Sequence, residues 1–294
     1  MLDITVPATL SNLGPGYDTL GLAVSLLNRF QFTLADDWRV GGEVVAPAQQ
    51  LTLATAQRAA HHFGGDLRGL HVVQTERVPR ARGLGSSATA RVAGLQAALT
   101  LCGLEVPLSE QLAFLCGEEG HPDNVVPALV GGLVIVEEDE GRVEHLRLPP
   151  PKLSVALCIP DREVRTDEAR RILPAEVSRG DAIFNLRRLG FLLVGLLQEH
   201  EEGVRHGLHD RLHQPWRAPL VGPVEAAFAG AMEAGALGAF ISGSGSTLAA
   251  FCTSDDVATM AAAALARPFA REGVACEQLV VRPVARGALA SPRP

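Results

Sequence analysis

Residues 82–90, RGLGSSATA, place two glycines and two serines directly ahead of a long alanine-rich run. Alanine and leucine fill the next turns, and Gly103 stands where a C-cap glycine belongs, so the loop is predicted to open a helix. Such an opening has two interpretations. Either the glycines form a turn and a serine caps the helix, or glycine backbone and the helix N-terminus bind an anion. The nine residues alone leave both open.

Composition limits the class of partner. The chain has 294 residues, of which 47% are hydrophobic and 20% charged, as in soluble globular proteins. Its net charge of -7 and the lack of a Lys/Arg-rich run argue against nucleic acid, so a small-molecule partner is expected. Lys152 is the only lysine, which excludes a P-loop lysine after the glycine loop.

The cysteines and the hydropathy indicate the compartment. The 5 cysteines are odd in number and contain no C-x-x-C pair, which is typical of buried thiols in a reducing compartment. The N-terminus MLDITVPATL lacks the features of a signal peptide, and the apolar run GFLLVGLL is too short to span a bilayer. We therefore expect a cytoplasmic protein without a membrane role.

Three prolines in LRLPPPKLSVALCIP interrupt the chain ahead of a new strand pattern. This predicts a domain boundary near residue 150, with domains at 1–150 and 151–294. Strand and helix patterns are mixed in both parts without strict βαβ repetition, which predicts two α+β domains.

A dense group of acids and amides occurs in GEEGHPDNVVPALVGG, residues 117–132. The stretch GHPDN is predicted to be a turn. A carboxylate there could bind the magnesium ion of a metal-bridged phosphate. The alternative is a solvated polar turn in which Asp123 or Asn124 caps the next element, and taken alone this alternative is favoured.

Two further groups of polar residues could form a binding site. The segment PATLSNLGPGYDTLG places Asn12 and Asp18 around a G-P-G turn, which is most often a corner between strands. Arg170 follows Thr166, the predicted N-cap of a helix, by four residues, and Arg217 lies in HQPWRAP. A lone arginine is usually a surface residue. Two that converge could hold a carboxylate in a bidentate pair.

The second glycine motif, ISGSGSTLAAF, has two interpretations as well. It could be another backbone anion nest, or a glycine-softened strand that packs against the first loop.

Together these segments resemble the GHMP kinase superfamily, and within it the homoserine kinases. Three superfamily motifs occur in order: PATLSNLGPGYDTLGLAV, VPRARGLGSSATARVAGL and ISGSGSTLAAF. The similarity to homoserine kinases is carried by EGHPDNVVPALVGG, IPDREVRTDEARRILP, FNLRRLG and HQPWRAP. The resemblance covers essentially the whole chain.

The resemblance implies a fold and a reaction. The fold is α+β, with an N-terminal domain like domain 2 of ribosomal protein S5, a ferredoxin-like C-terminal domain, and the active site between them. The reaction is ATP-dependent phosphorylation of the L-homoserine side-chain hydroxyl to O-phospho-L-homoserine, in threonine biosynthesis. The resemblance also implies a homodimer. Two other functions stay open: a kinase for mevalonate or another small alcohol, and a nucleotide-binding sensor without turnover.

The resemblance also assigns residues to the nucleotide. The segment that would surround the ATP phosphates consists of Pro79, Arg80, Ala81, Arg82, Gly83, Leu84, Gly85, Ser86, Ser87, Ala88 and Thr89. Ser87 and an acid, Glu119, would bind Mg²⁺, although the neighbouring Glu118 is an open alternative.

The amino-acid site implied by the resemblance consists of Asn12, Asp18, Asn124, Thr166, Arg170 and Arg217. Asp18 would meet the substrate ammonium, and Arg170 with Arg217 would clamp its carboxylate. Asn124 would orient the attacking hydroxyl. No strong base is expected, because a loose phosphoryl-transfer transition state depends mainly on positioning and charge neutralisation. Asp123 is the alternative base.

Overall fold

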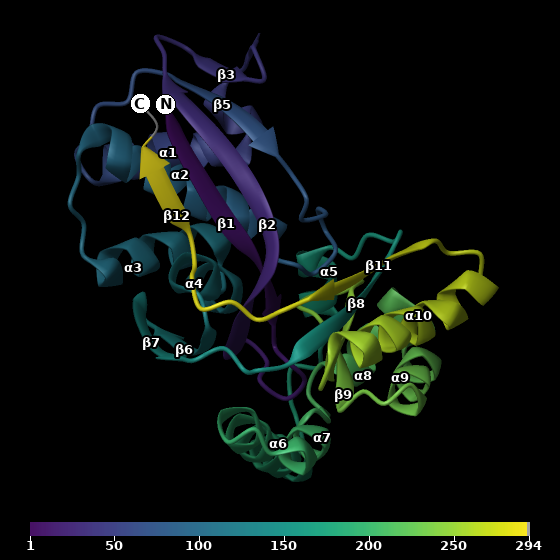
Figure 1. Cartoon of the computed structure of the whole chain (residues 1–294). Helices are drawn as coiled ribbons and strands as arrows, with labels where there is room; N and C mark the ends of the chain where they lie inside the picture. Colours follow the sequence, from purple (N-terminus) through teal and green to yellow (C-terminus); the bar gives the residue numbers. More distant parts are fainter. Residues whose placement is uncertain (293–294) are drawn as a thin grey trace.

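The chain folds around two β-sheets, each covered by helices (Figure 1). The computed structural model describes residues 1–292. Eight strands form the first sheet and four form the second. Helices and sheets are mixed in both halves, so the α+β prediction is confirmed.

The first sheet is built on two long neighbouring strands, β1 (Leu2–Ser11) and β2 (Leu20–Leu34). The C-terminal part of β2 pairs with β5, and its first residues pair with β6. This strand therefore joins β5, β3 and β4 to the β6–β7 hairpin. The remaining strands are β3 (Trp38–Val40), β4 (Glu43–Val44), β5 (Leu70–Thr75), β6 (Leu133–Asp139), β7 (Arg142–Leu148) and β12 (Leu289–Pro292).

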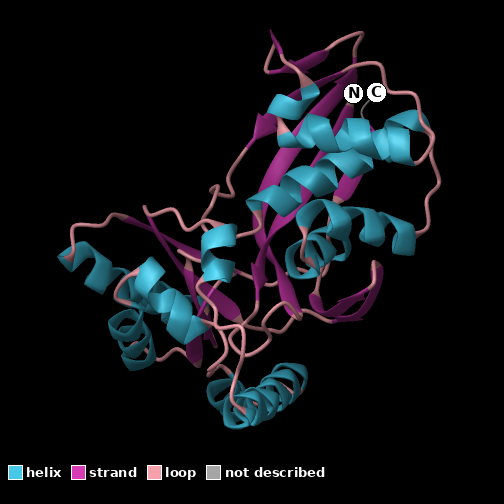
Figure 2. Ribbon diagram, turned by 180° about the vertical axis from the view of Figure 1, so that it is seen from behind, coloured by secondary structure: helices cyan, strands magenta, loops and turns pink. Residues whose placement is uncertain are grey.

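Four helices pack on one face of this sheet (Figure 2). Their apolar side chains form a core with the sheet, in which Ile4, Phe32 and Leu95 are fully buried. The helical elements of this half are η1 (Pro47–Gln49), α1 (Leu51–His62), α2 (Ser86–Cys102), α3 (Leu108–Glu119) and α4 (Pro122–Val130).

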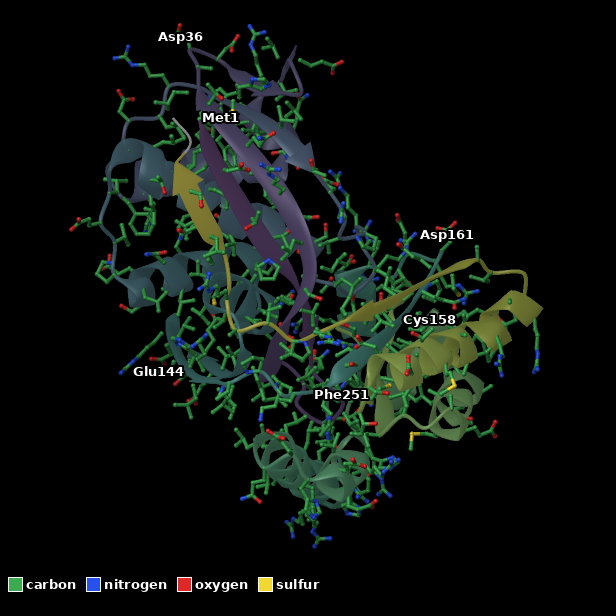
Figure 3. The ribbon with its side chains drawn as sticks, viewed as in Figure 1. Met1, Asp36, Glu144, Cys158, Asp161 and Phe251 are labelled. Carbon is green, nitrogen blue, oxygen red and sulfur yellow. The ribbon has the colours of Figure 1, made fainter. Side chains whose placement is uncertain are left out.

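The second sheet has the strand order β11-β8-β10-β9 and is antiparallel throughout. Along the chain, helices connect β8 to β9 and β10 to β11. This is the split β-α-β arrangement of ferredoxin-like domains. Cys158 on β8 and Phe251 on β10 are labelled in Figure 3 and lie in the interior. Its strands are β8 (Ser154–Pro160), β9 (Gly238–Ile241), β10 (Leu248–Cys252) and β11 (Cys276–Val281).

The helices of this half form two groups. One group packs on the second sheet, and the α6–α7 pair lies apart from it, at the lower edge of Figure 1. They are α5 (Thr166–Arg171), α6 (Arg179–Leu197), α7 (Glu201–Gly207), α8 (Gln214–Val221), α9 (Val224–Glu233) and α10 (Asp255–Arg271).

A shared hydrophobic core joins the two halves. Leu10 and Leu22 of the first sheet lie in one buried cluster with Leu157 and Phe251 of the second, and Leu192 of α6 belongs to it. The positions of residues on the two sheets are therefore fixed relative to one another, which a site between them requires.

The end of the chain returns to the first sheet, where β12 pairs with β1 (Figure 1). We propose that the chain divides into two domains near residue 150 and that the last strand, β12, belongs to the first domain. No helix within residues 1–292 is both long and apolar enough to cross a bilayer. The five cysteines are free thiols, and burial raises the pKa of Cys116 to about 12.

Candidate active site

A cavity of about 600 Å³ lies between the two halves. This volume is within the usual range for small-molecule sites. Its walls come from the β1–β2 turn, the loop before α2, the first turns of α4 and α5, helix α8, and the β9–β10 turn. Segments far apart in the sequence therefore meet here, and most of the residues predicted for the site line it.

The glycine loop is held tightly between β1 and the β9–β10 turn. Gly83 and Gly85 have φ of 74° and 69°, the left-handed region that favours glycine. A Cβ at Gly83 would overlap the carbonyl oxygen of Ser242, and one at Gly85 would overlap the Thr9 hydroxyl. Ser242 Oγ also donates to the Gly83 carbonyl at 2.6 Å. The second glycine motif therefore packs against the first loop.

Helix α2 begins directly after this loop without a side-chain cap. Gly85 is the N-cap residue, and neither serine closes the first turn. The N–H groups of that turn have no partner within the helix, and they lie at the positive end of the helix dipole beside the cavity. The serine-cap interpretation is therefore wrong, and the anion-binding interpretation remains.

Residues 79–89 divide into two groups. Leu84, Ala88 and Thr89 are buried, so their side chains belong to the protein interior. Pro79 is half-buried and does not line the cavity. Thr89 also lines the cavity, together with the remaining residues of the segment: Arg80, Ala81, Arg82, Gly83, Gly85, Ser86 and Ser87.

The two arginines of the loop are held by acids. Arg80 donates to Glu76 at 2.9 Å and 2.5 Å. Arg82 donates at 3.0 Å to Asp161, which follows β8 and is labelled in Figure 3. The second contact connects the loop to the other half of the molecule.

The adjacent glutamates at the end of α3 point in different directions. Ser87 Oγ donates to Glu119 Oε1 at 2.5 Å. Glu118 instead accepts from Arg58 Nε of α1, at 2.8 Å, and does not line the cavity. The geometry therefore brings Glu119, and not Glu118, beside the hydroxyl of Ser87.

The donor set of Ser87 and Glu119 fits Mg²⁺. A hydroxyl and a carboxylate beside a phosphate site provide the few protein oxygens that Mg²⁺ normally takes, the rest being phosphate oxygens and water. Residues 1–292 hold no cluster of three His, Cys, Asp or Glu side chains that could bind a metal without such help. Arg91, one turn after Ser87, places Nη1 2.5 Å from Glu119 Oε2.

Residues 122–124 form the first turn of helix α4, whereas the sequence predicted a turn there. His121 has extended backbone and Pro122 occupies the first helical position, where its fixed φ is favourable. Asp123 and Asn124 are 2% and 7% exposed. The solvated-turn interpretation is therefore wrong, because the turn is covered by β1.

The side chain of Asn124 is fixed by three contacts. Its Oδ1 accepts from Thr9 Oγ1 at 2.8 Å, and its Nδ2 donates to Ser11 Oγ at 3.0 Å. Nδ2 also lies 3.2 Å from Asp123 Oδ1. Strand β1 thus determines the orientation of the amide that faces the cavity.

His121 lies between the carboxylates of Asp123 and Glu119. Its Nδ1 lies 2.8 Å from Asp123 Oδ1, and Nε2 lies 3.9 Å from Glu119. Burial lowers the pKa of His121, but the hydrogen bond and charge of Asp123, with the charge of Glu119, outweigh it and raise the pKa above its ordinary value.

On the opposite wall, Arg170 of α5 forms a bidentate pair with Asp18, 2.8 Å for both contacts. Asp18 has a left-handed backbone, and its N–H donates to Asn12 Oδ1 at 3.0 Å. Asn12 Nδ2 donates to the Gly243 carbonyl at 3.1 Å. Thr166 is exposed and is the first residue of α5, one position after the observed N-cap, Arg165.

Arg217 lies beside Arg170 and is nearly fully buried. Its Nε donates to the Ala169 carbonyl at 3.1 Å and its Nη1 to the Gly243 carbonyl at 2.9 Å. The guanidinium carbons of Arg217 and Arg170 lie 5.0 Å and 5.8 Å from the ring centre of Tyr17. The two arginines therefore converge on one aromatic ring, within cation–π distance.

The sequence predictions did not include His213, which contacts Arg217 in this wall. His213 is fully buried, with Nε2 2.7 Å from the Gly14 carbonyl and Nδ1 3.4 Å from Arg217 Nη1. Because a carbonyl only accepts, Nε2 carries the proton and Nδ1 is free to accept from Arg217. The available signal was the HQPWR spacing, which places His213 one helical turn before Arg217.

Comparison with known proteins agrees with this geometry. Residues 50–132 match the family description GHMP kinases N terminal domain, and residues 192–271 match GHMP kinases C terminal. The chain is 39% identical over 262 residues to the homoserine kinase of Aquifex aeolicus, covering 87% of this chain and 88% of that protein. The chain belongs to the homoserine kinases of the GHMP kinase family.

Other relatives support the same assignment. The homoserine kinase of Thermosynechococcus vestitus is 44% identical over 255 residues, covering 84% of this chain and 85% of the relative. The crystal structure of homoserine kinase from Cytophaga hutchinsonii superposes with a TM-score of 0.88 at 28% identity, covering 99% and 97% of the two chains. A mevalonate kinase structure superposes with a TM-score of 0.68 at 13% identity, which shows a shared fold only. The protein is an ATP-dependent kinase with the GHMP fold.

Proposed function

We propose that this protein transfers the γ-phosphoryl group of ATP to the side-chain hydroxyl of L-homoserine, as a step of threonine biosynthesis. The hydroxyl oxygen forms the new bond to phosphorus, the bond from phosphorus to the bridging oxygen of ADP breaks, and the hydroxyl proton is released. The products are ADP and O-phospho-L-homoserine.

One observation carries the choice of acceptor. Arg170 and Arg217 converge over Tyr17, and the carboxylate of Asp18 lies in the same wall. Two guanidinium groups suit a carboxylate, and Asp18 suits an ammonium group. This arrangement fits the charged end of an amino acid. A simple alcohol would bring neither a carboxylate for the arginines nor an ammonium group for Asp18, and a hydroxy acid such as mevalonate would bring no ammonium group.

The other wall suits the nucleotide. We propose that the first-turn N–H groups of α2 and the backbone of Gly83 and Gly85 hold the ATP phosphates. The site has no lysine, since Lys152 is paired at the surface with Glu199. Positive charge near the phosphates comes from the helix dipole and from arginine.

We propose Ser87 and Glu119 as the residues that would hold Mg²⁺ beside those phosphates. When bound there, Mg²⁺ would neutralise the charge of the phosphate oxygens. The 2.5 Å contact between the two side chains supports the assignment, because ligands of one ion must lie close together.

We propose that Asn124 orients the acceptor hydroxyl. Thr9 and Ser11 hydrogen-bond to its amide on the side of β1. The side of the amide that faces the cavity is left for the substrate. Asp123 stays the alternative base. Its Oδ1 already accepts from Asn124 and contacts His121, which favours a positioning role over proton abstraction.

The test is a coupled ADP assay with MgATP and a panel of acceptors. L-homoserine should give the highest kcat/KM. Three controls change one feature each: D-homoserine inverts the α-carbon, 3-aminopropan-1-ol lacks the carboxylate, and 4-hydroxybutyrate lacks the ammonium group. Mevalonate is included as the alternative acceptor. Preference for mevalonate would overturn the acceptor. Nucleotide binding without turnover of any acceptor would indicate a sensor. From the resemblance we also propose a homodimer and a cytoplasmic location.

A further inference from the structure

Asn28 of β2 is a buried amide in a row of apolar side chains. Side chains alternate along a strand, so Asn28 shares one face of β2 with Phe30 and Phe32, which belong to the hydrophobic core. Asn28 is 1% exposed. A polar side chain in such a place costs free energy unless it is hydrogen-bonded. The partners of its hydrogen bonds therefore indicate what the amide does.

One end of the amide binds the segment that leads into the glycine loop. Strand β5 pairs with β2 as far as Thr75, which lies opposite Arg29. Beyond that pair, Asn28 Oδ1 accepts from the backbone N–H groups of Arg77 and Val78, at 2.7 Å and 2.9 Å. A side chain of β2 thus replaces the strand pairing that ends at Thr75, and it holds the backbone just ahead of the loop.

The other end of the amide binds the first turn of α2, where the loop ends. Asn28 Nδ2 donates to Thr89 Oγ1 at 2.9 Å, and Thr89 Oγ1 donates to the Ser86 carbonyl at 2.8 Å. Because backbone N–H groups only donate, the amide atom that faces them is Oδ1, so Nδ2 must face Thr89. Thr89 then accepts with its oxygen and gives its own proton to the carbonyl.

Asn28 therefore joins the two ends of the glycine loop. A continuous chain of hydrogen bonds runs from the backbone ahead of the loop, through Asn28 and Thr89, to the Ser86 carbonyl after it. The loop contains two glycines, which lose more conformational entropy on ordering than other residues. Fixing both ends of the loop in advance reduces the entropy that a ligand must remove when it binds. Both Asn28 and Thr89 also line the cavity.

We propose that Asn28 and Thr89 are positioning residues for the nucleotide. Together they hold the glycine loop and the first-turn N–H groups of α2 in the conformation that receives the ATP phosphates. The proposal rests on the phosphate site proposed above for α2. Loss of this bridge weakens nucleotide binding, whereas the acceptor wall of Asp18, Arg170 and Arg217 keeps its affinity, because other contacts hold that wall.

The first test is Thr89→Val, which keeps the shape of the side chain and removes its hydroxyl. The KM for ATP, and the Kd of the non-hydrolysable analogue AMP-PNP with Mg²⁺, should both rise about 10-fold, the effect expected for one buried hydrogen bond. The KM for homoserine should stay unchanged. Thr89→Ser keeps a hydroxyl at this position and should restore both nucleotide values. Isothermal titration calorimetry measures the Kd.

Thr55→Val is the matched control. Thr55 is buried in α1, and its Oγ1 donates to the Leu51 carbonyl at 2.9 Å, much as Thr89 donates within α2. Among residues 1–292 its hydroxyl makes no hydrogen bond to the glycine loop. The control should lower the melting temperature as Thr89→Val does and leave the Kd of AMP-PNP unchanged. It therefore separates a loss of stability from the loss of the bridge.

A double-mutant cycle tests whether the two residues act as one unit. Asn28→Leu removes both ends of the bridge, so it should raise the Kd of AMP-PNP more than Thr89→Val does. Adding Thr89→Val to Asn28→Leu should then cause little further increase, because the hydroxyl has already lost its amide partner. Fully additive effects would contradict the bridge. Circular dichroism checks that each variant is folded, and if Asn28→Leu is not, the two Thr89 variants decide alone.

Two further outcomes would overturn the proposal. An unchanged Kd of AMP-PNP in Thr89→Val would remove the bridge from nucleotide binding. Equal increases in the KM values for ATP and homoserine would give the bridge a general structural role. The binding measurement needs no acceptor. If the unaltered protein does not phosphorylate homoserine while Thr89→Val still weakens AMP-PNP binding, the proposed acceptor fails and the positioning role stands.

Discussion

Asp18 and Arg170 form a bidentate ion pair that joins the β1–β2 turn to α5 within one wall of the cavity. Both residues are proposed to bind an amino acid, Asp18 through its ammonium and Arg170 through its carboxylate. A zwitterion that enters the site offers each of them an opposite charge. The pair therefore has to open or to share its charges when the acceptor binds.

Asp18→Asn should remove the preference for an ammonium group. We expect kcat/KM for L-homoserine to fall about 10- to 100-fold, which corresponds to one charged hydrogen bond. Activity toward 4-hydroxybutyrate, which lacks the ammonium, should change little. The measurement is the ratio of kcat/KM for the two acceptors, and an unchanged ratio would remove Asp18 from the ammonium site.

Arg217→Ala should raise the KM for homoserine far more than the KM for ATP. The expected increase is roughly 10- to 100-fold, because a charged hydrogen bond is lost from a desolvated site. Arg217 also donates to two backbone carbonyls, so thermal melting must show that the variant is folded. Equal effects on both KM values would place Arg217 outside the carboxylate site.

Glu119→Gln should increase the Mg²⁺ concentration needed for half-maximal rate and lower kcat at least about 10-fold. Ser87→Ala should act in the same direction. Glu118→Gln is the matched control on the same helix, since Glu118 pairs with Arg58 away from the cavity. The measurement is initial rate against free Mg²⁺. If Glu118→Gln has the larger effect, the two glutamates must exchange their proposed roles.

Arg91→Leu should strengthen Mg²⁺ binding. Arg91 holds its guanidinium beside the buried Glu119, where it competes with another cation for the same carboxylate. We expect a lower melting temperature without metal, because Glu119 loses its partner, and a larger rise on addition of Mg²⁺ with an ATP analogue. Thermal melting with and without Mg²⁺ measures both. A smaller rise than in the unaltered protein would contradict the competition.

His213→Gln should change how stability depends on pH. Burial lowers the pKa of His213 below its ordinary value of 6.5, although the charge of Asp210 partly offsets this. Between the two values the unfolded chain binds a proton that the folded protein does not. Stability from this group is therefore complete above about pH 6.5 and declines as the pH falls below it.

The measurement is urea unfolding of both proteins at about pH 7.5 and about pH 5.5. The unaltered protein should lose more free energy of unfolding than the variant on acidification, by at most about 1.4 kcal/mol per pH unit for one proton. His121 has a raised pKa and acts in the opposite direction, but it is present in both proteins. Identical pH dependence would mean that His213 does not titrate differently on folding.

The sequence by itself determined the elements that depend on local preference. Gly83 and Gly85 had to adopt unusual backbone angles, and the alanine-rich run after them had to be helical, because these preferences act over a few residues. The family motifs then indicated the fold and the set of site residues. The composition excluded a P-loop lysine without any structure.

Only the tertiary structure decided which polar groups meet. The direction of Glu119 toward Ser87, and of Glu118 toward Arg58, depends on where α3 packs against α2 and α1. The burial of Asp123 depends on β1, more than a hundred residues earlier, and the support of Arg217 by His213 depends on the β1–β2 turn. Hydrogen bonds and burial act through space, so partners far apart in the chain become known only when the fold brings them together.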